Sequence, residues 1–155
     1  MSRSTFVYVT YIHTTQQKLW SALTEDTEFM KQYWFGFHCE SAWTAGSPWK
    51  MVSGDGVVTD EGEILEADPP RRLVIRWRHQ NKPELKVEGE SRCTMELEPS
   101  GSAVKLSITH TMEREPSKLI AAVSGGWPMI LSNLKSLIET GSTILQDPHL
   151  KGDRP

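Results

Sequence analysis

The chain has few of the features that mark a membrane protein, an oxidised protein or a nucleic-acid-binding protein. Only two cysteines, Cys39 and Cys93, occur among 155 residues, and they form no Cys-x-x-Cys pair. Two reduced, buried thiols are therefore expected rather than a disulfide or a metal site. No apolar run approaches the ~20 residues that span a bilayer, and the N-terminal residues alternate between polar and apolar instead of forming an export signal. We therefore expect a cytoplasmic protein that does not insert into a membrane.

Basic clusters and catalytic motifs are also missing. The net charge is −3, and the longest basic cluster is Arg71-Arg72, whereas binding to nucleic acid needs clustered Lys and Arg. The chain contains no Gly-x-Ser-x-Gly, His-Glu-x-x-His, P-loop or Gly-x-Gly-x-x-Gly motif. The spacing of the histidines fits no set of metal ligands, so we expect them to bind no metal. They are His13, His38, His79, His110 and His149. The sequence therefore predicts no nucleic-acid partner, no metal and no cofactor.

The sequence does predict a clear order of strands and helices. Residues 6–12 are β-branched and aromatic, which predicts a strand. Thr14 and Gln17 have the spacing of a capping box at the start of a helix, and a second short helix is predicted from Asp26. Alternating residues then predict a strand over 35–43. A turn and a short strand are predicted over 45–52, and further strands over 57–68, 73–78, 88–99 and 102–112, with a polar loop over 79–85 and a hairpin at 98–102.

Strands that follow one another without intervening helices imply antiparallel pairing. The apolar face of such a sheet needs a cover, and the helix predicted from Leu119 to its C-cap at Gly141 is the only element long enough to provide it. The sequence therefore predicts an α+β fold with a single domain over residues 5–141 and a polar tail over 142–155.

Two glycines and a proline interrupt the apolar stripe of this last helix. Inside a helix they would cost roughly 5 kcal/mol, so we expect a bend or break at Gly125-Gly126, with Pro128 in the first turn of the second part and Trp127 facing the sheet. Two interpretations remain open. In the first, Trp127 anchors the core and the glycines allow close backbone approach. In the second, the bend lifts the helix from the sheet and leaves space for a ligand beside Trp127, and the two interpretations do not exclude each other.

His110 is the titratable residue of greatest interest. It shares its strand face with Val104, Leu106 and Ile108 and is therefore expected to point inward. There it would either bond within the core or serve as an acid or base near neutral pH, which makes it a weak catalytic candidate. Acidic residues at Glu61, Glu63 and Glu66 are instead expected on a solvated strand, the first two on one face and the third on the other.

Four stretches of the sequence resemble the START-like SRPBCC superfamily, in its branch of activators of the heat-shock chaperone ATPase (AHSA-like). They are "VYVTYIHTTQQKLWSALTE", "GEILEADPPRRLVIRW", "MELEPSGSAVKLSITH" and "GGWPMILSNLKSLIETG". The resemblance covers residues 5–141 and implies a helix-grip fold, in which a curved antiparallel sheet wraps around a long C-terminal helix, with two short helices after the first strand and a cavity between the layers. Members bind apolar small molecules, catalyse ring closures or assist chaperones.

Together these observations predict a protein that holds an apolar or aromatic small molecule in a cavity of ~300–1,000 Å³. The alternatives are a cyclase or hydrolase that uses His110 as acid or base, and an interaction module like the chaperone activators. Because the additional N-terminal domain of the eukaryotic activators has no counterpart in the sequence, we expect no chaperone partner. An open sheet edge allows a homodimer. The residues predicted to line the cavity are Phe37, Trp43, Trp77, His110, Trp127 and Ile130.

Overall fold

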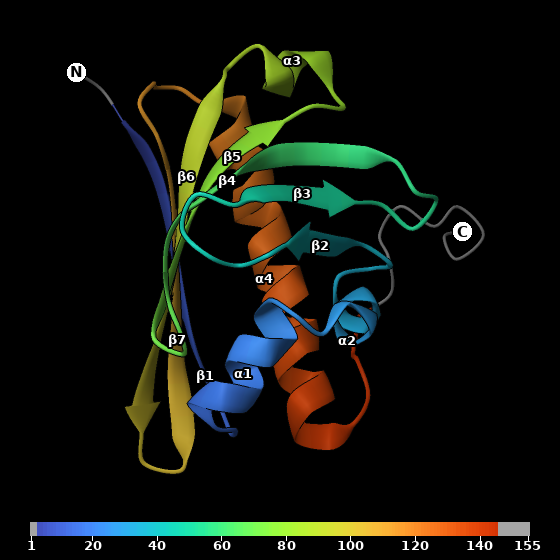
Figure 1. Ribbon diagram of the computed structural model, residues 1–155, viewed down its shortest axis with the longest axis vertical. Coiled ribbons are helices and arrows are strands. Elements are labelled where there is room, and N and C mark those ends of the chain that lie inside the picture. The colour runs from blue at the N-terminus through green and yellow to red at the C-terminus, as the bar shows by residue number, and fades with distance from the viewer. Residues whose placement is uncertain (1–2, 146–155) are drawn as a thin grey trace.

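The computed structural model describes residues 3–145 and shows a sheet curled around one long helix (Figure 1). The elements, in chain order, are β1 (Ser4–Ile12), α1 (Gln16–Leu23), α2 (Thr27–Tyr33), β2 (His38–Ser41), β3 (Pro48–Val52), β4 (Val58–Asp68), β5 (Arg72–His79), α3 (Pro83–Lys86), β6 (Glu90–Ser100), β7 (Ala103–Met112) and α4 (Lys118–Thr140).

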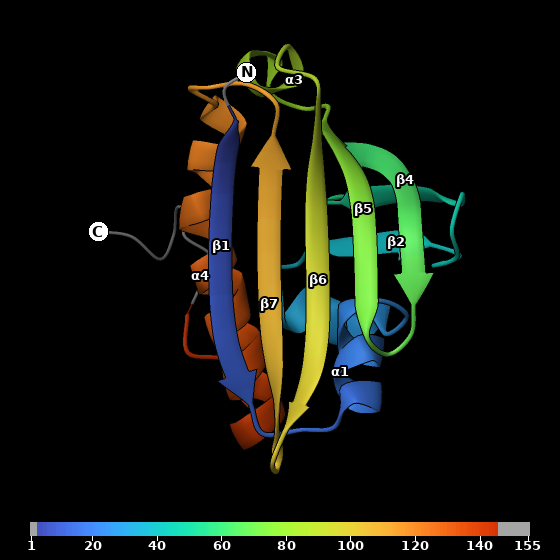
Figure 2. The same cartoon turned by 90° about the vertical axis from the view of Figure 1, so that its left-hand side faces the viewer.

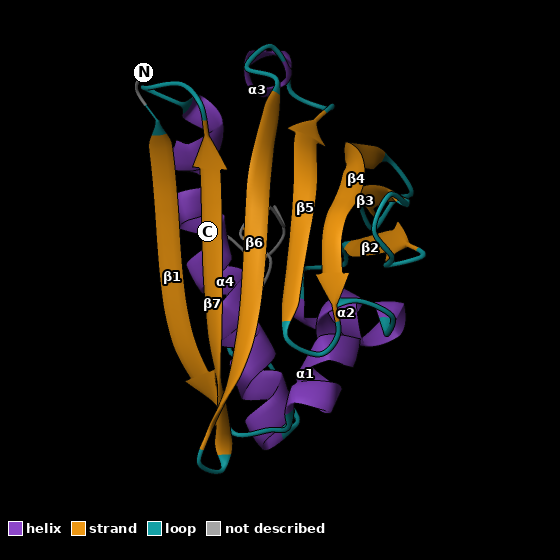
Figure 3. Ribbon diagram, turned by 60° about the vertical axis from the view of Figure 1, so that its left-hand side comes forward, coloured by secondary structure: helices purple, strands orange, loops and turns teal. Residues whose placement is uncertain are grey.

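The seven strands form one antiparallel sheet in the order β1-β7-β6-β5-β4-β3-β2. Figure 2 shows its outer face, with α4 behind β1 and β7, and Figure 3 shows α1, α2 and α4 together on the opposite, inner side. β2 and β3 cross in front of α4 in Figure 1, so the sheet wraps around the helix. The predicted α+β helix-grip fold is confirmed.

Alternation along the strands builds the core between the sheet and α4. On β7 the buried side chains are every second residue, including Leu106, Ile108 and His110, as the sequence predicts. Leu106 and Ile108 share one apolar cluster with Leu131 and Leu134 of α4. The last turns of α4 are tied to the end of β1, because the Lys135 ammonium donates to the backbone of Tyr11 and the Glu139 carboxylate accepts from the amide of His13.

Of the bend or break predicted in the last helix, the break is wrong. α4 runs from Lys118 to Thr140 with Pro128 inside it, and it ends at Gly141 in the left-handed conformation, as predicted. Six of its apolar side chains are buried, each worth roughly 2 kcal/mol, and this exceeds the cost of the two glycines and the proline. Close backbone approach at the glycines is also wrong, because a Cβ added at Gly125 or Gly126 would meet no atom within 4 Å.

Three local predictions need correction. The first helix is capped by Thr15, whose hydroxyl accepts from the Lys18 amide, so the cap lies one residue after Thr14. The strand predicted over 35–43 is only His38–Ser41, because Phe35 and Trp43 have φ of 52° and 60°, outside the extended region. The loop predicted over 79–85 contains α3, which begins at Pro83, a residue suited to a first helical turn.

The predicted tail over 142–155 is described only as far as Leu145, where Asn133 accepts from the amides of Ile144 and Leu145; residues 146–155, and His149 with them, lie outside the described part. Within residues 3–145, no helix combines the length and the apolar character needed to cross a bilayer.

Candidate functional site

An aromatic cluster fills the interior between the sheet and α4. Trp77 comes from β5, His110 from β7 and Trp127 from α4, and all three are buried. The ring centroids lie 5.0 Å apart for Trp77 and His110, 6.0 Å for Trp77 and Trp127, and 6.4 Å for His110 and Trp127. Three of the six residues predicted to line a cavity thus meet in one place.

The other three predicted residues lie outside this group of rings. Ile130 and Phe37 are partly buried against the same core, and Trp43 is buried just after β2. In the described part of the chain, no ring contact joins Phe37 or Trp43 to the cluster. The left-handed backbone at Trp43 ends the strand that was expected to present both side chains on one face.

Two further indoles complete the cluster, and the prediction left them out. The ring centroid of Trp34, just after α2, lies 5.4 Å from that of Trp127, and the ring centroid of Trp49 on β3 lies 4.6 Å from that of Trp77. Trp34 follows Met30 at helical spacing, a signal that the sequence contains. Trp49 reaches Trp77 across Gly62 of β4, which pairs with both residues and carries no side chain between them.

His110 is held by hydrogen bonds on both ring nitrogens. The indole N–H of Trp127 donates to Nδ1 (3.2 Å), so the proton of a neutral ring lies on Nε2, which is 2.8 Å from the hydroxyl of Ser91. That hydroxyl donates in turn to the backbone oxygen of Trp77. Burial lowers the pKa of His110 to about 4, against a smaller opposing effect of Asp60. His110 is therefore neutral near pH 7, and neither of its nitrogens is free to exchange a proton with a substrate.

Asp60 and His79 form a second polar pair on the same inner face. They are direct neighbours on β4 and β5, and Asp60 is only 2% exposed. One carboxylate oxygen, Oδ2, accepts from His79 Nδ1 (2.9 Å) and from the indole N–H of Trp77 (2.7 Å). The other oxygen, Oδ1, and His79 Nε2 are buried without a partner. His79 shares its strand phase with Trp77, a signal that the sequence contains, whereas nothing in the sequence singled out Asp60.

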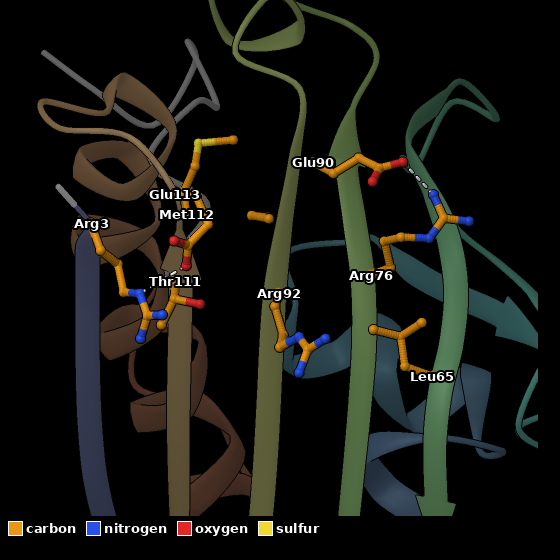
Figure 4. A pocket seen from close by; sticks show the side chains of 9 residues that line it. Arg3, Leu65, Arg76, Glu90, Arg92, Thr111, Met112 and Glu113 are labelled. Carbon is orange, nitrogen blue, oxygen red and sulfur yellow. Dashed lines mark hydrogen bonds and ion pairs between the residues drawn. The ribbon is translucent and has the colours of Figure 1, made fainter. Parts of the chain in front are cut away.

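Two pockets within residues 3–145 border the site without reaching its centre. One, of about 450 Å³, lies across the outer face of the sheet, where Arg3 and Arg76 pair with Glu113 and Glu90 (Figure 4). The other, of about 550 Å³, is formed by β2, β3 and β4. Ser91 lines the first pocket and Trp49 lines the second, whereas neither pocket is lined by Trp77, His110 or Trp127. Within residues 3–145 no three His, Cys, Asp or Glu side chains are grouped to hold a metal ion.

The fold and the sequence can be compared with those of known proteins. No curated protein sequence matches the chain. Among solved structures, a protein of Mesorhizobium loti has a TM-score of 0.74 and 21% identity over 88% of this chain and 97% of its own. The Aha1 dimer of Colwellia psychrerythraea has a TM-score of 0.71 and 19% identity, covering 89% and 98% of the two chains. An HSP90 activator of Plasmodium falciparum has a TM-score of 0.69 and 19% identity, covering 86% and 94%.

These structures share the fold, and a family model matches the sequence itself. The model is described as "Activator of Hsp90 ATPase homolog 1-like protein", and it matches residues 13–139, which is most of the chain. The resemblance noted in the sequence is thereby confirmed. The chain belongs to the family of activator of Hsp90 ATPase homolog 1-like proteins, within the START-like SRPBCC superfamily.

Proposed function

We propose that this protein binds an apolar or aromatic small molecule between α4 and the sheet, in order to sequester, sense or transport it. The observation that supports the proposal is the aromatic cluster, in which four indoles and one imidazole line the interior together with a few polar groups. Small-molecule sites are typically lined in this way. Because side chains occupy the interior, binding requires the rings around Trp127 to change rotamer, a common adjustment at binding sites.

Native mass spectrometry of freshly purified protein tests this proposal. The expected result is a co-purified small molecule whose mass disappears after denaturation. Ile130→Arg places a charge beside the cluster at a partly buried position and is expected to abolish the bound mass. Ile144→Arg makes the same change at a side chain that is 67% exposed and serves as the control. A wild-type spectrum without ligand, together with no shift of the Trp77 and Trp127 indole N–H signals on addition of naphthalene, contradicts the proposal.

A second candidate is stimulation of a chaperone ATPase, contrary to the expectation from the sequence. It is supported by the structural match to the Plasmodium HSP90 activator, which covers 94% of that protein's chain. Hsp90 ATPase rate with and without the purified chain is the test. Stimulation that survives Ile130→Arg would assign the activity to a surface instead of the interior.

We also infer that the protein forms a homodimer through β1, because a relative of the same fold is a dimer and β1 is a sheet edge with exposed apolar side chains.

A further inference from the structure

The strongest unexplained feature of the interior is a set of buried polar atoms that lack partners. Three of them are Asp60 Oδ1, His79 Nε2 and the indole nitrogen of Trp49, on the neighbouring strands β4, β5 and β3, and a fourth is His38 Nδ1 on β2. The Trp49 indole has no nitrogen or oxygen partner and is directed at the sulfur of Cys39, which is only a weak acceptor. Buried hydrogen-bonding groups are nearly always paired in folded proteins, and an unpaired group costs about 1–3 kcal/mol, more when it is charged. The three atoms on β3, β4 and β5, beside the tilted pair of indoles Trp49 and Trp77, therefore point to a bound molecule.

The chemistry of these atoms limits what that molecule is. Because His79 donates to Asp60 through Nδ1, a neutral His79 offers a lone pair at Nε2. Asp60 Oδ1 also accepts, whereas the Trp49 indole can only donate. The set therefore contains two acceptors and one donor, and a hydroxyl group can both donate to an acceptor and accept from the indole.

The charge and the walls of the site restrict the ligand further. The structure places no Lys or Arg against Asp60 within residues 3–145; its ion-pair partner there is His79. An anionic ligand beside this carboxylate would add a second negative charge in a poorly solvated interior, which is unfavourable. Trp49 and Trp77, 4.6 Å apart, provide flat apolar walls, which suit an aromatic ring.

We propose that Asp60, His79 and Trp49 form a receptor for the hydroxyl group of a neutral, hydroxyl-bearing aromatic molecule. The Asp60 carboxylate orients His79, the hydroxyl hydrogen bonds to one of the two acceptors, and the ring packs against the indoles. His110 shapes the neighbouring wall without contributing a free nitrogen. This inference rests on the proposed function, since it names the ligand class and the contacts of the same interior.

Three probes of similar size separate the contributions of the hydroxyl group, the apolar ring and a negative charge to binding. They are 2-naphthol, naphthalene and 2-naphthoate. Calorimetry at pH 7 with the full chain is expected to show that 2-naphthol binds at least about tenfold more tightly than naphthalene, the effect of one hydrogen bond to a charged acceptor. We expect 2-naphthoate not to bind. In ¹⁵N–¹H spectra, 2-naphthol is expected to shift the indole N–H signals of Trp49 and Trp77, assigned with Trp49→Phe.

Variants identify the atoms involved. Asp60→Asn is expected to lower the affinity for 2-naphthol to that for naphthalene. His79→Asn keeps an N–H near the position of Nδ1 but removes Nε2, and it reports on the site even if Asp60→Asn does not fold. Glu61→Gln makes the same charge change one residue along β4, on an exposed side chain, and is expected to bind as the wild type does.

Two results would overturn the inference. One is equal affinity for 2-naphthol and naphthalene, which leaves an apolar interior site, and hence the proposed function, intact. The other is a crystal structure with bound 2-naphthol in which an ordered water, and not the hydroxyl group of the ligand, hydrogen bonds to Asp60 Oδ1. If neither naphthalene nor 2-naphthol binds, the proposed function fails together with the inference.

Discussion

Gly62 pairs with Trp49 on one side and Trp77 on the other, and its missing side chain is a requirement of the fold. A Cβ at this position would lie 1.6 Å from the backbone oxygen of Arg76, an atom fixed in the β4–β5 pairing. Gly62→Ala is therefore expected to lower the free energy of unfolding by about 1–3 kcal/mol, the usual cost of overpacking. Urea denaturation measures it. Unchanged stability would show that β4 can move away from β5 at this point.

His110 determines a pH dependence of stability. Burial lowers its pKa from the ordinary 6.5 to about 4 in the folded protein. Between these values the unfolded chain takes up a proton that the folded chain does not, so stability is fully present above pH 6.5 and falls as the pH decreases toward 4. The total loss is roughly 3 kcal/mol.

Denaturation midpoints from pH 7 to pH 5 test this dependence. His110→Gln is expected to be less stable at every pH, but with a smaller pH slope. His13→Gln, at an exposed histidine, is expected to keep the wild-type slope. Equal slopes in the wild type and His110→Gln would mean that a proton reaches His110 without unfolding.

At the scale of the elements, local signals predicted most boundaries but not the path of α4. Gly125, Gly126 and Pro128 argue for a break when the helix is considered alone, and burial of Trp127 and its neighbours on the stripe outweighs them. Alternation along a strand likewise did not always predict the correct face of the sheet for a residue. A bulge between Ile64 and Glu66 brings Glu66 onto the outer face, where it pairs with Arg72, contrary to its predicted face.

In the site, too, alternation along the strands predicted some of the residues, whereas the register between strands determines the others. Alternation on β5 and β7 was sufficient to place Trp77 and His110 on one inner face. The Asp60–His79 pair depends instead on the register of β4 against β5, and an irregularity at Ile64/Glu66 shifts that register. No pattern within a single strand reports such a shift.

The continuity of α4 makes a prediction opposite in sign to that for Gly62. Gly125 is exposed within the helix, and an added Cβ meets nothing within 4 Å. Gly125→Ala is therefore expected to stabilise the protein by about 1 kcal/mol, since alanine is the better helix former. Thermal and urea unfolding measure the change, and the variant is also the matched control for Gly62→Ala. Destabilisation would indicate that the helix needs the glycine for a bend.

At the scale of the whole molecule, β1 is the longer of the two edge strands of the sheet in the described part of the chain. Its outward side chains Val7, Val9 and Tyr11 are 56%, 44% and 51% exposed. Antiparallel pairing of two β1 strands about a two-fold axis near Tyr8 would set Val7 opposite Val9 of the other copy at both positions and would join the two sheets edge to edge. Because the edge groups of a strand readily pair in this way, we expect a dimer in solution.

Sedimentation velocity over a range of concentrations tests the dimer. The double variant Val7→Lys, Val9→Lys sets lysine opposite lysine in the pairing and is expected to weaken dimerisation at least tenfold, while the exposed positions leave the stability of each subunit nearly unchanged. Val57→Lys with Val87→Lys adds the same charge at two valines that are 45% and 77% exposed away from β1, and is expected to dimerise normally. A wild-type chain that stays monomeric at all concentrations, or a dimer that survives the β1 lysines, would place any assembly on another surface and leave β1 a free edge.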